Sequence, residues 1–398
     1  MSHLRPTLLL TRDFPPMGGG VSRWMAEFAR FAEPGSLIVS TGRMEGSDPV
    51  DGRFPQRIDR VPVHVDRLRT TLGVWRWTRR VRALTVANDV PFIWCAHVKP
   101  AGYPARSILD RHGVPYGMIF HGTELLLLKE KISRSGWKLR TATRLIGGAS
   151  ALVANSRYTA GLVREVLDML GLPERGDEVH VIPLGTDPAM FRPGLDTTEV
   201  RARYGLDGEG VWLMTVARLV AHKGIDTVLR ALALLRHEHP NIRYAVIGEG
   251  QRRAAFEALA RELGVADTVH FAGFVPDDDL PAVLDCADIY VHVPRRVEGM
   301  VEGFGIVISE ASASGLPVIT GNDGGMPDAV RDGETGIVLQ DTEPETVARA
   351  IAGLVRDETH RRRLGEAGRR AVETYFNWER VTADLRRIQR EAMARQGR

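Results

Sequence analysis

Short, continuous apolar runs alternate with segments of helical spacing along nearly the whole chain, and this alternation constrains the fold more than any other feature. The runs at 7–11 (TLLLT), 211–216 (VWLMTV) and 242–247 (IRYAVI) are examples. A strand that is apolar on both faces belongs in a parallel sheet that helices cover on both sides. The sequence therefore predicts an α/β protein with doubly wound, Rossmann-like sheets.

Strands and helices are expected to follow one another in regular order. The expected strands lie at 7–11, 36–40, 61–65, 91–95, 115–120, 150–154, 178–182, 211–216, 242–247, 268–271, 288–293 and 316–320. The expected helices lie at 21–32, 102–112, 156–170, 224–238, 251–263, 277–286, 304–315 and 343–356, and helical segments close the chain. This order gives one set of alternating elements in each half of the chain.

A segment rich in Pro and Gly indicates where the two halves divide. At 398 residues the chain is longer than one hydrophobic core usually fills, and the pattern restarts after 182–194 (IPLGTDPAMFRPG). We expect an N-terminal domain at 1–187, a C-terminal domain at 188–375 and a final helix at 376–398. Doubly wound sheets bind ligands at the carboxyl ends of their strands, so we expect the site in a cleft between the domains.

Composition predicts a cytoplasmic protein. The chain has no apolar stretch long enough to span a membrane, and the short apolar run near its start is expected to be a buried strand and not a signal peptide. The two cysteines, Cys95 and Cys286, lie far apart in apolar segments, which fits free thiols in a reducing compartment. A net charge of +3 does not point to nucleic acid as a partner.

Basic residues are concentrated between Arg60 and Arg82, where seven arginines accompany a single acid, Asp66. If this stretch is helical, it has an apolar face and a basic face. The apolar face would carry Val74, Trp77, Val81 and Leu84, and the basic face would carry Trp75, Arg76, Arg79, Arg80 and Arg82. Such a basic face suits an anionic membrane surface or an anionic acceptor; the alternative is an ordinary solvated helix face.

Two loops have features of a phosphate site. Gly18–Gly20 precede a helix that is expected near Val21, and glycine lets a ligand approach the backbone and the unpaired N–H groups of a helix start. Arg218 and Lys223, in 216–224 (VARLVAHKG), follow the first strand of the second domain, where two cations match a diphosphate. The alternatives are a tight strand-to-helix turn and two ordinary surface cations.

His121, in FHGTE, follows another apolar strand. At the carboxyl end of a strand its imidazole can donate to a polar group in the cleft, or orient it. A lone histidine is more often a satisfied structural residue. The glycine that follows and the position at a strand end favour a functional role.

Two carboxylates, Glu302 and Glu310, flank a glycine-punctuated apolar run in VEGFGIVISEA. A carboxylate accepts hydrogen bonds from the neighbouring hydroxyls of a ribose or a hexose. The alternatives are a glycosidase pair, which usually comes from separate elements, and a solvated helix start. A second VEG triplet contains Glu298, but only Glu302 is separated from Glu310 by seven residues.

No metal site is predicted. The acids at 277–279 come directly before an expected helix, where aspartates cap the helix and complement its dipole. The sequence contains no paired His/Cys spacing of the kind that binds zinc.

The order of these motifs resembles that of the retaining glycosyltransferases of family 4, which have the GT-B fold. EGFGIVISEASASGLPVI is similar to the E-x7-E segment of that family, and the further similar motifs are DFPPMGGG, HGTE, ANSRYTA, IPLGTD, ARLVAHKG, VIGEG, FAGFV and GGMPDAV. The ordered set covers nearly the whole chain and is far more specific than any one motif. TRDFPPMGGGVSRW and VEGFGIVISEA look most like the branch that includes phosphatidylinositol mannosyltransferases.

This resemblance implies transfer of a hexosyl unit from a nucleoside-diphosphate sugar, GDP-mannose or a UDP-sugar, with retained anomeric configuration. It implies no cofactor and no required metal ion, and a lipid or glycan as acceptor. The protein would be cytoplasmic or peripheral on the inner face of the membrane. Its final helix would cross back to the N-terminal domain.

Residues that match the family's motifs would take the corresponding roles. The catalytic set would be His121, Arg218, Lys223 and Glu302: the two cations hold the diphosphate, Glu302 the sugar hydroxyls and His121 a hydroxyl near the reacting carbon. The donor-binding set would be Gly19, Gly20, Gly248, Glu249, Gly273, Phe274, Val275, Gly303, Phe304, Gly305, Ile306 and Glu310, with Glu310 at the ribose.

Two other functions fit the same architecture. A nucleotide-sugar epimerase would need further acid–base residues in the cleft, and the sequence shows no such set. A catalytically silent subunit would bind a partner or an anionic surface through residues 60–82. The intact set of cations and carboxylates argues against that second alternative.

Overall fold

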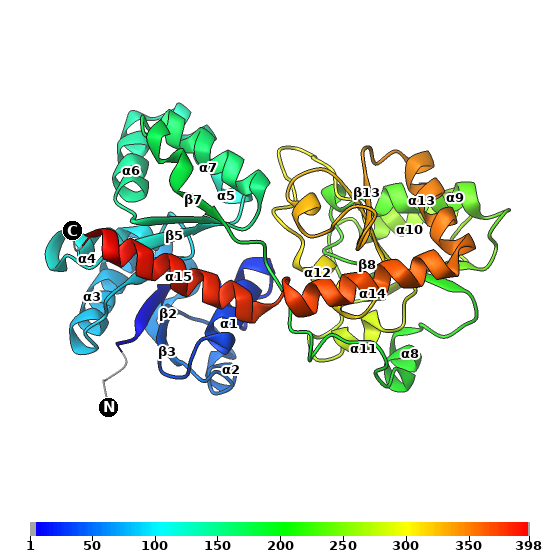
Figure 1. The fold of residues 1–398 in the computed structure, drawn as a ribbon, viewed down its shortest axis with the longest axis horizontal. Helices are drawn as coiled ribbons and strands as arrows, with labels where there is room; N and C mark the ends of the chain where they lie inside the picture. Colours follow the sequence, from blue (N-terminus) through cyan, green and yellow to red (C-terminus); the bar gives the residue numbers. More distant parts are fainter. Residues whose placement is uncertain (1–4, 397–398) are drawn as a thin grey trace. The chain divides into compact units, whose positions relative to one another are not determined.

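The computed structural model describes residues 5–396, and packing divides them into two compact units, each built around one parallel sheet (Figure 1). Unit 1 consists of the described residues up to Pro183 and from Trp378 onward, and unit 2 of Leu184–Asn377. The predicted α/β fold with two Rossmann-like sheets is confirmed. None of the helices within residues 5–396 combines the length and the apolar character that crossing a bilayer requires.

Unit 1 contains a seven-stranded sheet in the order β3-β2-β1-β4-β5-β6-β7, and its neighbouring strands are parallel. The strands are β1 (Thr7–Leu10), β2 (Leu37–Arg43), β3 (Arg57–His64), β4 (Ile93–Cys95), β5 (Tyr116–Phe120), β6 (Ala151–Ala154) and β7 (Val179–Val181). The chain forms β2 and β3 on one side of β1 and then returns to form β4 on the other. The topological switch point therefore lies between β1 and β4.

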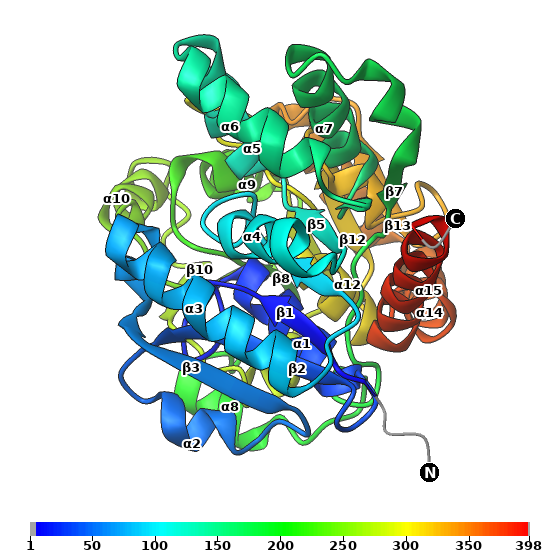
Figure 2. The ribbon, with the colours of Figure 1, turned by 90° about the vertical axis from the view of Figure 1, so that its left-hand side faces the viewer.

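The helices of unit 1 connect these strands. They are α1 (Gly20–Phe31), α2 (Ser47–Asp51), α3 (Thr71–Ala87), α4 (Gly102–His112), α5 (Thr123–Ser133), α6 (Gly136–Gly147), α7 (Arg157–Met169) and α15 (Trp378–Gln396), with the 3-10 helices η1 (Val65–Arg69) and η2 (Pro173–Glu178). Helices α3 and α4 lie side by side (Figure 2).

The closing helix α15 packs against α1 and belongs to unit 1. Gln389 fixes it to the sheet: its side-chain amide donates to Thr7 Oγ1 at 2.8 Å, and its carbonyl accepts from Trp94 Nε1 at 3.2 Å. Because Thr7 lies in β1 and Trp94 in β4, α15 is anchored at the two central strands.

Unit 2 contains a six-stranded parallel sheet in the order β10-β9-β8-β11-β12-β13. The strands are β8 (Val211–Val216), β9 (Ile242–Ile247), β10 (Val269–Gly273), β11 (Ile289–His292), β12 (Val318–Gly321) and β13 (Gly336–Leu339). Its switch point lies between β8 and β11, which pair over only the two positions Leu213–Ile289 and Met214–Tyr290. By contrast, β8 and β9 pair over the full length of both strands.

Helices connect the strands of unit 2 as they do in unit 1. They are α8 (Thr198–Tyr204), α9 (Ile225–Leu235), α10 (Arg253–Glu262), α11 (Leu280–Leu284), α12 (Ile306–Ala313), α13 (Pro344–Arg356) and α14 (Glu358–Thr374), with η3 (Ala221–Lys223) and η4 (Met326–Asp328). Asp279 occupies the N-cap position of α11, but its side chain does not cap the helix and instead accepts from Tyr204 and Arg203.

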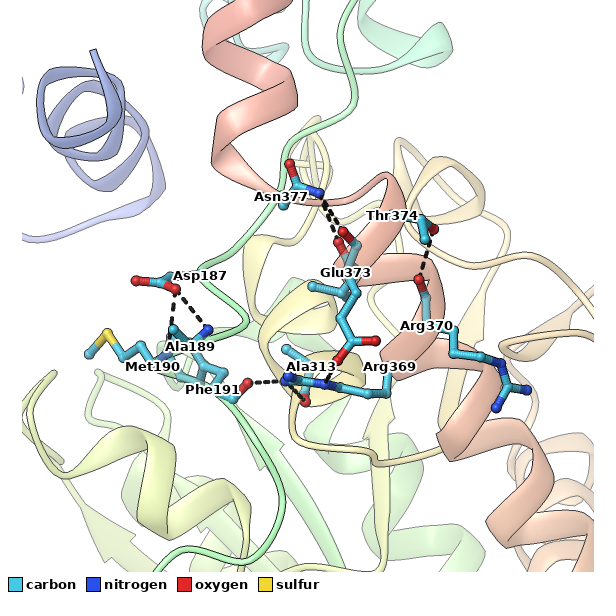
Figure 3. Close-up of polar contacts among 11 residues, drawn as sticks. Asp187, Ala189, Met190, Phe191, Ala313, Arg369, Arg370, Glu373, Thr374 and Asn377 are labelled. Carbon is cyan, nitrogen blue, oxygen red and sulfur yellow. Dashed lines mark hydrogen bonds and ion pairs between the residues drawn. The ribbon is translucent and has the colours of Figure 1, made fainter. Parts of the chain in front are cut away.

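The first residues of unit 2 are fastened to α14 (Figure 3). The Arg369 guanidinium donates to Phe191 O at 2.6 Å and to Ala313 O at 2.8 Å, and its Nε donates to Glu373. Since Ala313 ends α12, one arginine joins the entry segment, α12 and α14. The end of the unit is closed by Asn377, whose amide donates to the last carbonyls of α14.

The structure contains several elements that apolar periodicity did not predict. These are β13, the short helices α2 and α8, and the helical pair α5 and α6. β13 follows a loop and is only four residues long. The α5 sequence TELLLLKEKIS begins with a leucine run whose apolar residues do not select one face, so it gives no clear helical period.

Candidate functional site

An ion pair joins the two strands at the switch point of unit 2. Lys223 lies in η3, after β8, and its ammonium contacts Oε2 of Glu302, which follows β11. Only 13% of the Lys223 side chain and 19% of the Glu302 side chain are exposed. Because β8 and β11 are neighbours, this pair lies at the edge where doubly wound sheets bind their ligands.

The residue after Lys223 must be glycine. Gly224 has a φ of +75°, and a Cβ atom there would stand 2.0 Å from the carbonyl oxygen of Val293. Both the backbone conformation and the available space therefore exclude a side chain at this position. The close approach brings η3 against the end of β11, and this brings Lys223 to Glu302.

The loop that carries Arg218 rests on a second glycine. Gly248 has a φ of +126°, and a Cβ atom there would stand 2.1 Å from the carbonyl oxygen of Ala217. Leu219 N donates to Glu249 O at 2.9 Å, so the loop is held along the end of β9.

Arg218 itself is exposed. No carboxylate within residues 5–396 forms an ion pair with its guanidinium. Its five N–H donors are therefore available to an anion from outside the chain.

The two VEG triplets have different structures. Glu298 is exposed, has a φ of +50° and lies in a tight turn closed by a hydrogen bond of 2.8 Å from Met300 N to Val297 O. Glu302 lies in the interior of the site, where Gly325 N donates to its carbonyl oxygen at 3.0 Å. The structure thus brings Glu302, and not Glu298, to the lysine.

Neighbouring groups stabilise the negative charge of Glu302. Burial tends to raise the pKa of Glu302, but Lys223 and His292 together outweigh burial and hold this pKa well below its usual range. The Nε2 atom of His292 lies 3.8 Å from Oε2 of Glu302. Burial lowers the pKa of His292, and burial followed by the charge of Lys223 lowers the pKa of His222. Burial thus favours the neutral forms of both imidazoles, while the carboxylate of Glu302 is held in its charged form.

The second carboxylate is buried in α12. Glu310 is only 1% exposed. Burial, followed by the charges of Glu310 and Glu302 among other neighbours, raises the pKa of Tyr290 well above its usual value. Both carboxylates therefore act on one phenol, whose hydroxyl donates to Val216 O at the end of β8.

The backbone between the two carboxylates forms the start of α12. The helix begins at Ile306, two residues after the predicted start at 304. Phe304 is buried and Gly305 has a φ of +79° at the N-cap position. Gly303 and Gly305 are half-buried, so they are more exposed than Phe304 and Ile306, which are buried.

The predicted donor-binding residues Gly273, Phe274 and Val275 lie at the end of β10. Gly248 N donates to Gly273 O at 2.7 Å, so this segment lies beside the end of β9. Phe274 is 71% exposed and Val275 is buried. The carboxylate of Glu249 forms an ion pair of 2.7 Å with Arg253.

His121 is fixed in unit 1 at the end of β5. Its Nε2 atom lies 2.8 Å from Ala96 O, and since a carbonyl only accepts, Nε2 carries the proton. Burial lowers the pKa of His121. The imidazole is therefore neutral at neutral pH, and its Nδ1 atom has a free lone pair. Glu124 accepts from His121 N at 2.6 Å and holds this strand end.

A further acid–base pair spans the switch point of unit 1. Asp13 follows β1 and His97 follows β4, and the Nε2 atom of His97 lies 3.2 Å from Oδ2 of Asp13. Arg12 forms an ion pair of 2.7 Å with the same carboxylate. Burial tends to raise the pKa of Asp13, but His97 and Arg12 outweigh burial and hold it at about 2. Each unit thus carries an acid–base pair at its switch point.

The glycine loop of unit 1 leads directly into α1. The helix begins at Gly20, and Gly19 is its N-cap residue with a φ of +115°. Cβ atoms at Gly18 and Gly19 would meet no atom within 4 Å. The backbone conformation therefore favours glycine at position 19, and close packing within the chain requires glycine at neither position.

The arginine-rich segment is the helix α3, in which Trp77, Val81 and Leu84 of the predicted apolar face are buried, Val74 is half-buried and the predicted basic face points outward. Arg76, Arg79 and Arg82 are exposed. Arg79 lies over the exposed ring of Trp75, 4.9 Å from the ring centroid. Arg80 is less available, because its Nε atom donates to buried Asp59 at 3.0 Å.

Arg12, His97 and three further side chains of these two clusters were not predicted as site residues. His222 and His292 contribute to the cluster of unit 2, and Asp13 to that of unit 1. All three come at or just after the carboxyl end of a predicted strand, which is the one signal that could have indicated them. Across the part of the chain that the structure describes, no three His, Cys, Asp or Glu side chains are grouped so as to hold a metal ion.

Both halves of the chain match models of known families. Residues 196–371 match glycosyl transferases group 1, and residues 18–190 match glycosyltransferase family 4.

Two relatives are similar along most of the chain. A GDP-mannose-dependent alpha-(1-6)-phosphatidylinositol monomannoside mannosyltransferase of Mycolicibacterium smegmatis is 32% identical over 95% of this chain and 96% of its own length. A D-inositol 3-phosphate glycosyltransferase of Acidothermus cellulolyticus is 32% identical over 75% of this chain and 67% of its own length.

A solved structure shows the same fold. The Anabaena protein HepE in complex with UDP has a TM-score of 0.77 and 20% identity, over 97% of this chain and all of that one.

Proposed function

The chain belongs to the group 1 and family 4 glycosyltransferases, and we propose that it moves a hexosyl unit from a nucleoside-diphosphate sugar to a lipid or glycan acceptor with retention of anomeric configuration. The Lys223–Glu302 pair at the switch point of unit 2 carries this proposal. It sets a cation suited to a phosphate directly beside a carboxylate suited to sugar hydroxyls. When the residues are considered one by one in the sequence, no cation or carboxylate connects phosphate binding with sugar binding in this way.

The donor diphosphate would lie on Arg218 and Lys223. Arg218 offers an exposed guanidinium without an ion pair within the described residues, and such a group binds a diphosphate through two oxygens. Lys223 adds a point charge. Two cations of the chain at this place take the role that a divalent metal has in other sugar transferases, so we propose that transfer needs no metal ion.

The sugar and the ribose would bind to the two carboxylates. Glu302 is held in its charged form and accepts from the sugar hydroxyls. Glu310, in α12, accepts from the ribose hydroxyls. The base would lie beside Gly273, Phe274 and Val275, where the exposed Phe274 ring offers a stacking surface.

GDP-mannose is the donor we favour, because the similar mannosyltransferase of Mycolicibacterium smegmatis is named for it. The name of the structural relative in complex with UDP keeps a UDP-sugar as the second candidate. The two sequence relatives are named for inositol-containing acceptors that carry a phosphate. An inositol phosphate headgroup on a lipid is therefore the acceptor class we favour. The protein would act at the inner face of the membrane as a peripheral enzyme.

The chemistry follows from charge. Breaking the bond between the anomeric carbon and the donor phosphate leaves negative charge on the diphosphate, and Arg218 and Lys223 stabilise that charge. The anomeric carbon becomes electron-poor, and an acceptor hydroxyl attacks from the face that the diphosphate leaves. The acceptor proton passes to the departing phosphate oxygen. His121, neutral with a free Nδ1 lone pair, accepts a hydrogen bond from a sugar hydroxyl near the reacting carbon.

One assay separates this function from its alternatives. Purified protein is incubated with GDP-mannose or a UDP-sugar, with and without a phosphatidylinositol acceptor, and with and without EDTA. Release of nucleoside diphosphate and glycosylated lipid only when acceptor is present, and equally with EDTA, supports the proposal. Appearance of an epimerised nucleotide-sugar would instead indicate an epimerase. No turnover with any donor would indicate a binding subunit.

A further inference from the structure

A groove of about 700 Å³ lies between α4 and α6 of unit 1, both labelled in Figure 2. Its lining combines aromatic rings with an unusual density of guanidinium groups. The residues that matter here are Tyr103, Trp137, Arg106, Arg111, Arg140 and Arg144. Neither the donor site nor the arginine-rich helix α3 includes this groove.

Internal ion pairs neutralise only one side of the groove. Asp110 contacts Arg106 at 2.8 Å and Arg144 at 2.6 Å, and so ties α4 to α6. Within residues 5–396, no carboxylate pairs with Arg111 or Arg140. The groove therefore keeps positive charge after its internal pairs are counted.

The mouth of the groove is also positive. The ammonium of Lys99 lies 5.8 Å from the centroid of the Tyr103 ring and 5.9 Å from that of the Trp137 ring. Burial, followed by the charges of Lys131 and Lys138, lowers the pKa of Lys99. This repulsion among three lysines has no compensating carboxylate in the described part of the chain, and an external anion would relieve it.

The sequence of α5 and α6 continues this charge. Residues 129–144 (KEKISRSGWKLRTATR) contain six cations and one acid, Glu130. Trp137 stands among these cations and is 69% exposed, and Leu127, just before this segment in the sequence, is 50% exposed. Exposed tryptophan and leucine beside lysine and arginine are typical of surfaces that enter the headgroup region of a membrane.

We propose that the groove between α4 and α6 docks an anionic phospholipid of a membrane surface. The phosphate would bind between Lys99 and Arg140, and the rings of Tyr103 and Trp137 would contact the glycerol and the upper acyl chains. Nucleic acid fits less well, because stacking bases needs open aromatic faces in series. Here the Tyr103 and Trp137 rings both face Lys99.

This surface differs from the basic face of α3 because its cations border a groove that is lined by aromatic rings. On α3, Arg80 binds buried Asp59 and Arg79 lies over Trp75, while Arg76, Arg79 and Arg82 have no ion pair within residues 5–396. Beside the groove, Lys131, Lys138 and Arg140 have no ion pair within residues 5–396. An uncompensated cluster loses less on meeting an anionic surface, since no internal pair has to break.

The test is sedimentation of the full-length protein with vesicles of phosphatidylcholine, with or without roughly a third phosphatidylglycerol. The test variant is the triple substitution K131Q/K138Q/R140Q. The matched control is R230Q/R261Q/R390Q, which removes the same charge from exposed arginines elsewhere. Both variants change surface residues, and equal unfolding temperatures verify that they fold. Trp137→Ala is a second test that leaves the net charge unchanged.

We expect the wild type and the control to bind the anionic vesicles, and the triple variant to bind at least about tenfold more weakly. Trp137→Ala should weaken binding severalfold. Equal binding by the triple variant and the control would overturn the proposal, as would the absence of wild-type binding. Tighter binding to single-stranded RNA than to the vesicles would overturn it as well. Vesicle binding requires neither donor nor sugar transfer, so failure of this proposal would count against the peripheral location at the membrane but leave the proposed sugar-transfer reaction untouched.

Discussion

The ammonium of Lys223 and the carboxylate of Glu302 are in contact at the switch point between β8 and β11 of unit 2, although 79 positions separate them in sequence. Neither group is fully solvated, and each is the other's main partner of opposite charge. The pair therefore has a structural role in the empty protein as well as its proposed role with a donor.

A double-mutant cycle tests the structural role. Lys223→Met and Glu302→Gln each leave a partly buried charge without its partner, so each should lower the free energy of unfolding by about 2 kcal/mol. The double variant should lose clearly less than the sum of the two. Urea unfolding of the full chain measures all four corners of the cycle, and simple additivity would refute the coupling.

The two VEG triplets provide a matched pair for activity. Glu302→Gln should lower kcat/KM for sugar transfer by about 10- to 100-fold, because it removes a charged acceptor from the sugar hydroxyls. Glu298→Gln is the same chemical change four positions away, at an exposed turn, and should leave kcat/KM unaltered. Equal losses in the two variants would remove Glu302 from the site.

Arg218→Ala should lower kcat about 100-fold or more, since the charge on the leaving diphosphate would lose a preorganised partner. Arg230→Ala, an exposed arginine on α9, is its control. Steady-state release of nucleoside diphosphate measures both. Undiminished turnover by Arg218→Ala would rule out its part in leaving-group stabilisation.

Glu310→Ala tests the ribose assignment by binding alone. A ligand raises the unfolding temperature in proportion to RT ln(1 + [L]/Kd), so the preferred nucleotide should shift the wild type. The shift should vanish in Glu310→Ala if this carboxylate holds the ribose. A full shift in a folded variant would refute the assignment. The 2′-deoxynucleotide should likewise shift the wild type less.

Asp13→Asn should show a characteristic pH dependence. The pKa of Asp13 is about 2 in the folded protein, below the usual 3.8, so its charge stabilises the fold above about pH 4 and this stabilisation is lost as pH falls toward 2. We expect Asp13→Asn to cost about 2 kcal/mol at pH 7 and progressively less below pH 4. A urea midpoint measured from pH 7 to pH 3 tests this, and a difference that does not change with pH would contradict it.

The sheets were predictable because their strands are apolar on both faces. The runs at 7–11 and 211–216 coincide closely with β1 and β8, because a strand that is covered on both faces is apolar at nearly every position. β13 was not predicted, because GIVL is brief and follows a loop. The leucine run of α5 was missed for a different reason: leucines fill the consecutive positions 125–128 although Leu127 is half exposed, so the sequence shows no helical period there.

The candidate site was only partly predictable. Arg218, Lys223, Glu302 and Glu310 could be named because they stand in motifs at the ends of strands. The partnership of Lys223 with Glu302 could not, since it depends on β8 and β11 becoming neighbours. The pairing of Asp13 with His97 arises in the same way from β1 and β4. The resemblance to the family's motifs predicted roles for single residues. The contacts between those residues could be read only from the fold.

The ladder between β8 and β11 covers just two positions, so the sheet of unit 2 consists of two three-stranded halves with little backbone pairing between them. Each half forms from consecutive stretches of chain, and the loops with Lys223 and Glu302 belong to different halves. A sugar nucleotide held by both loops would link the two halves of the sheet across the boundary between β8 and β11. The amide hydrogen of Asp288, which donates to Trp212 O across this boundary at 2.8 Å, should then exchange with solvent more slowly in the presence of donor, and the enzyme would be most resistant to proteolysis while it is loaded.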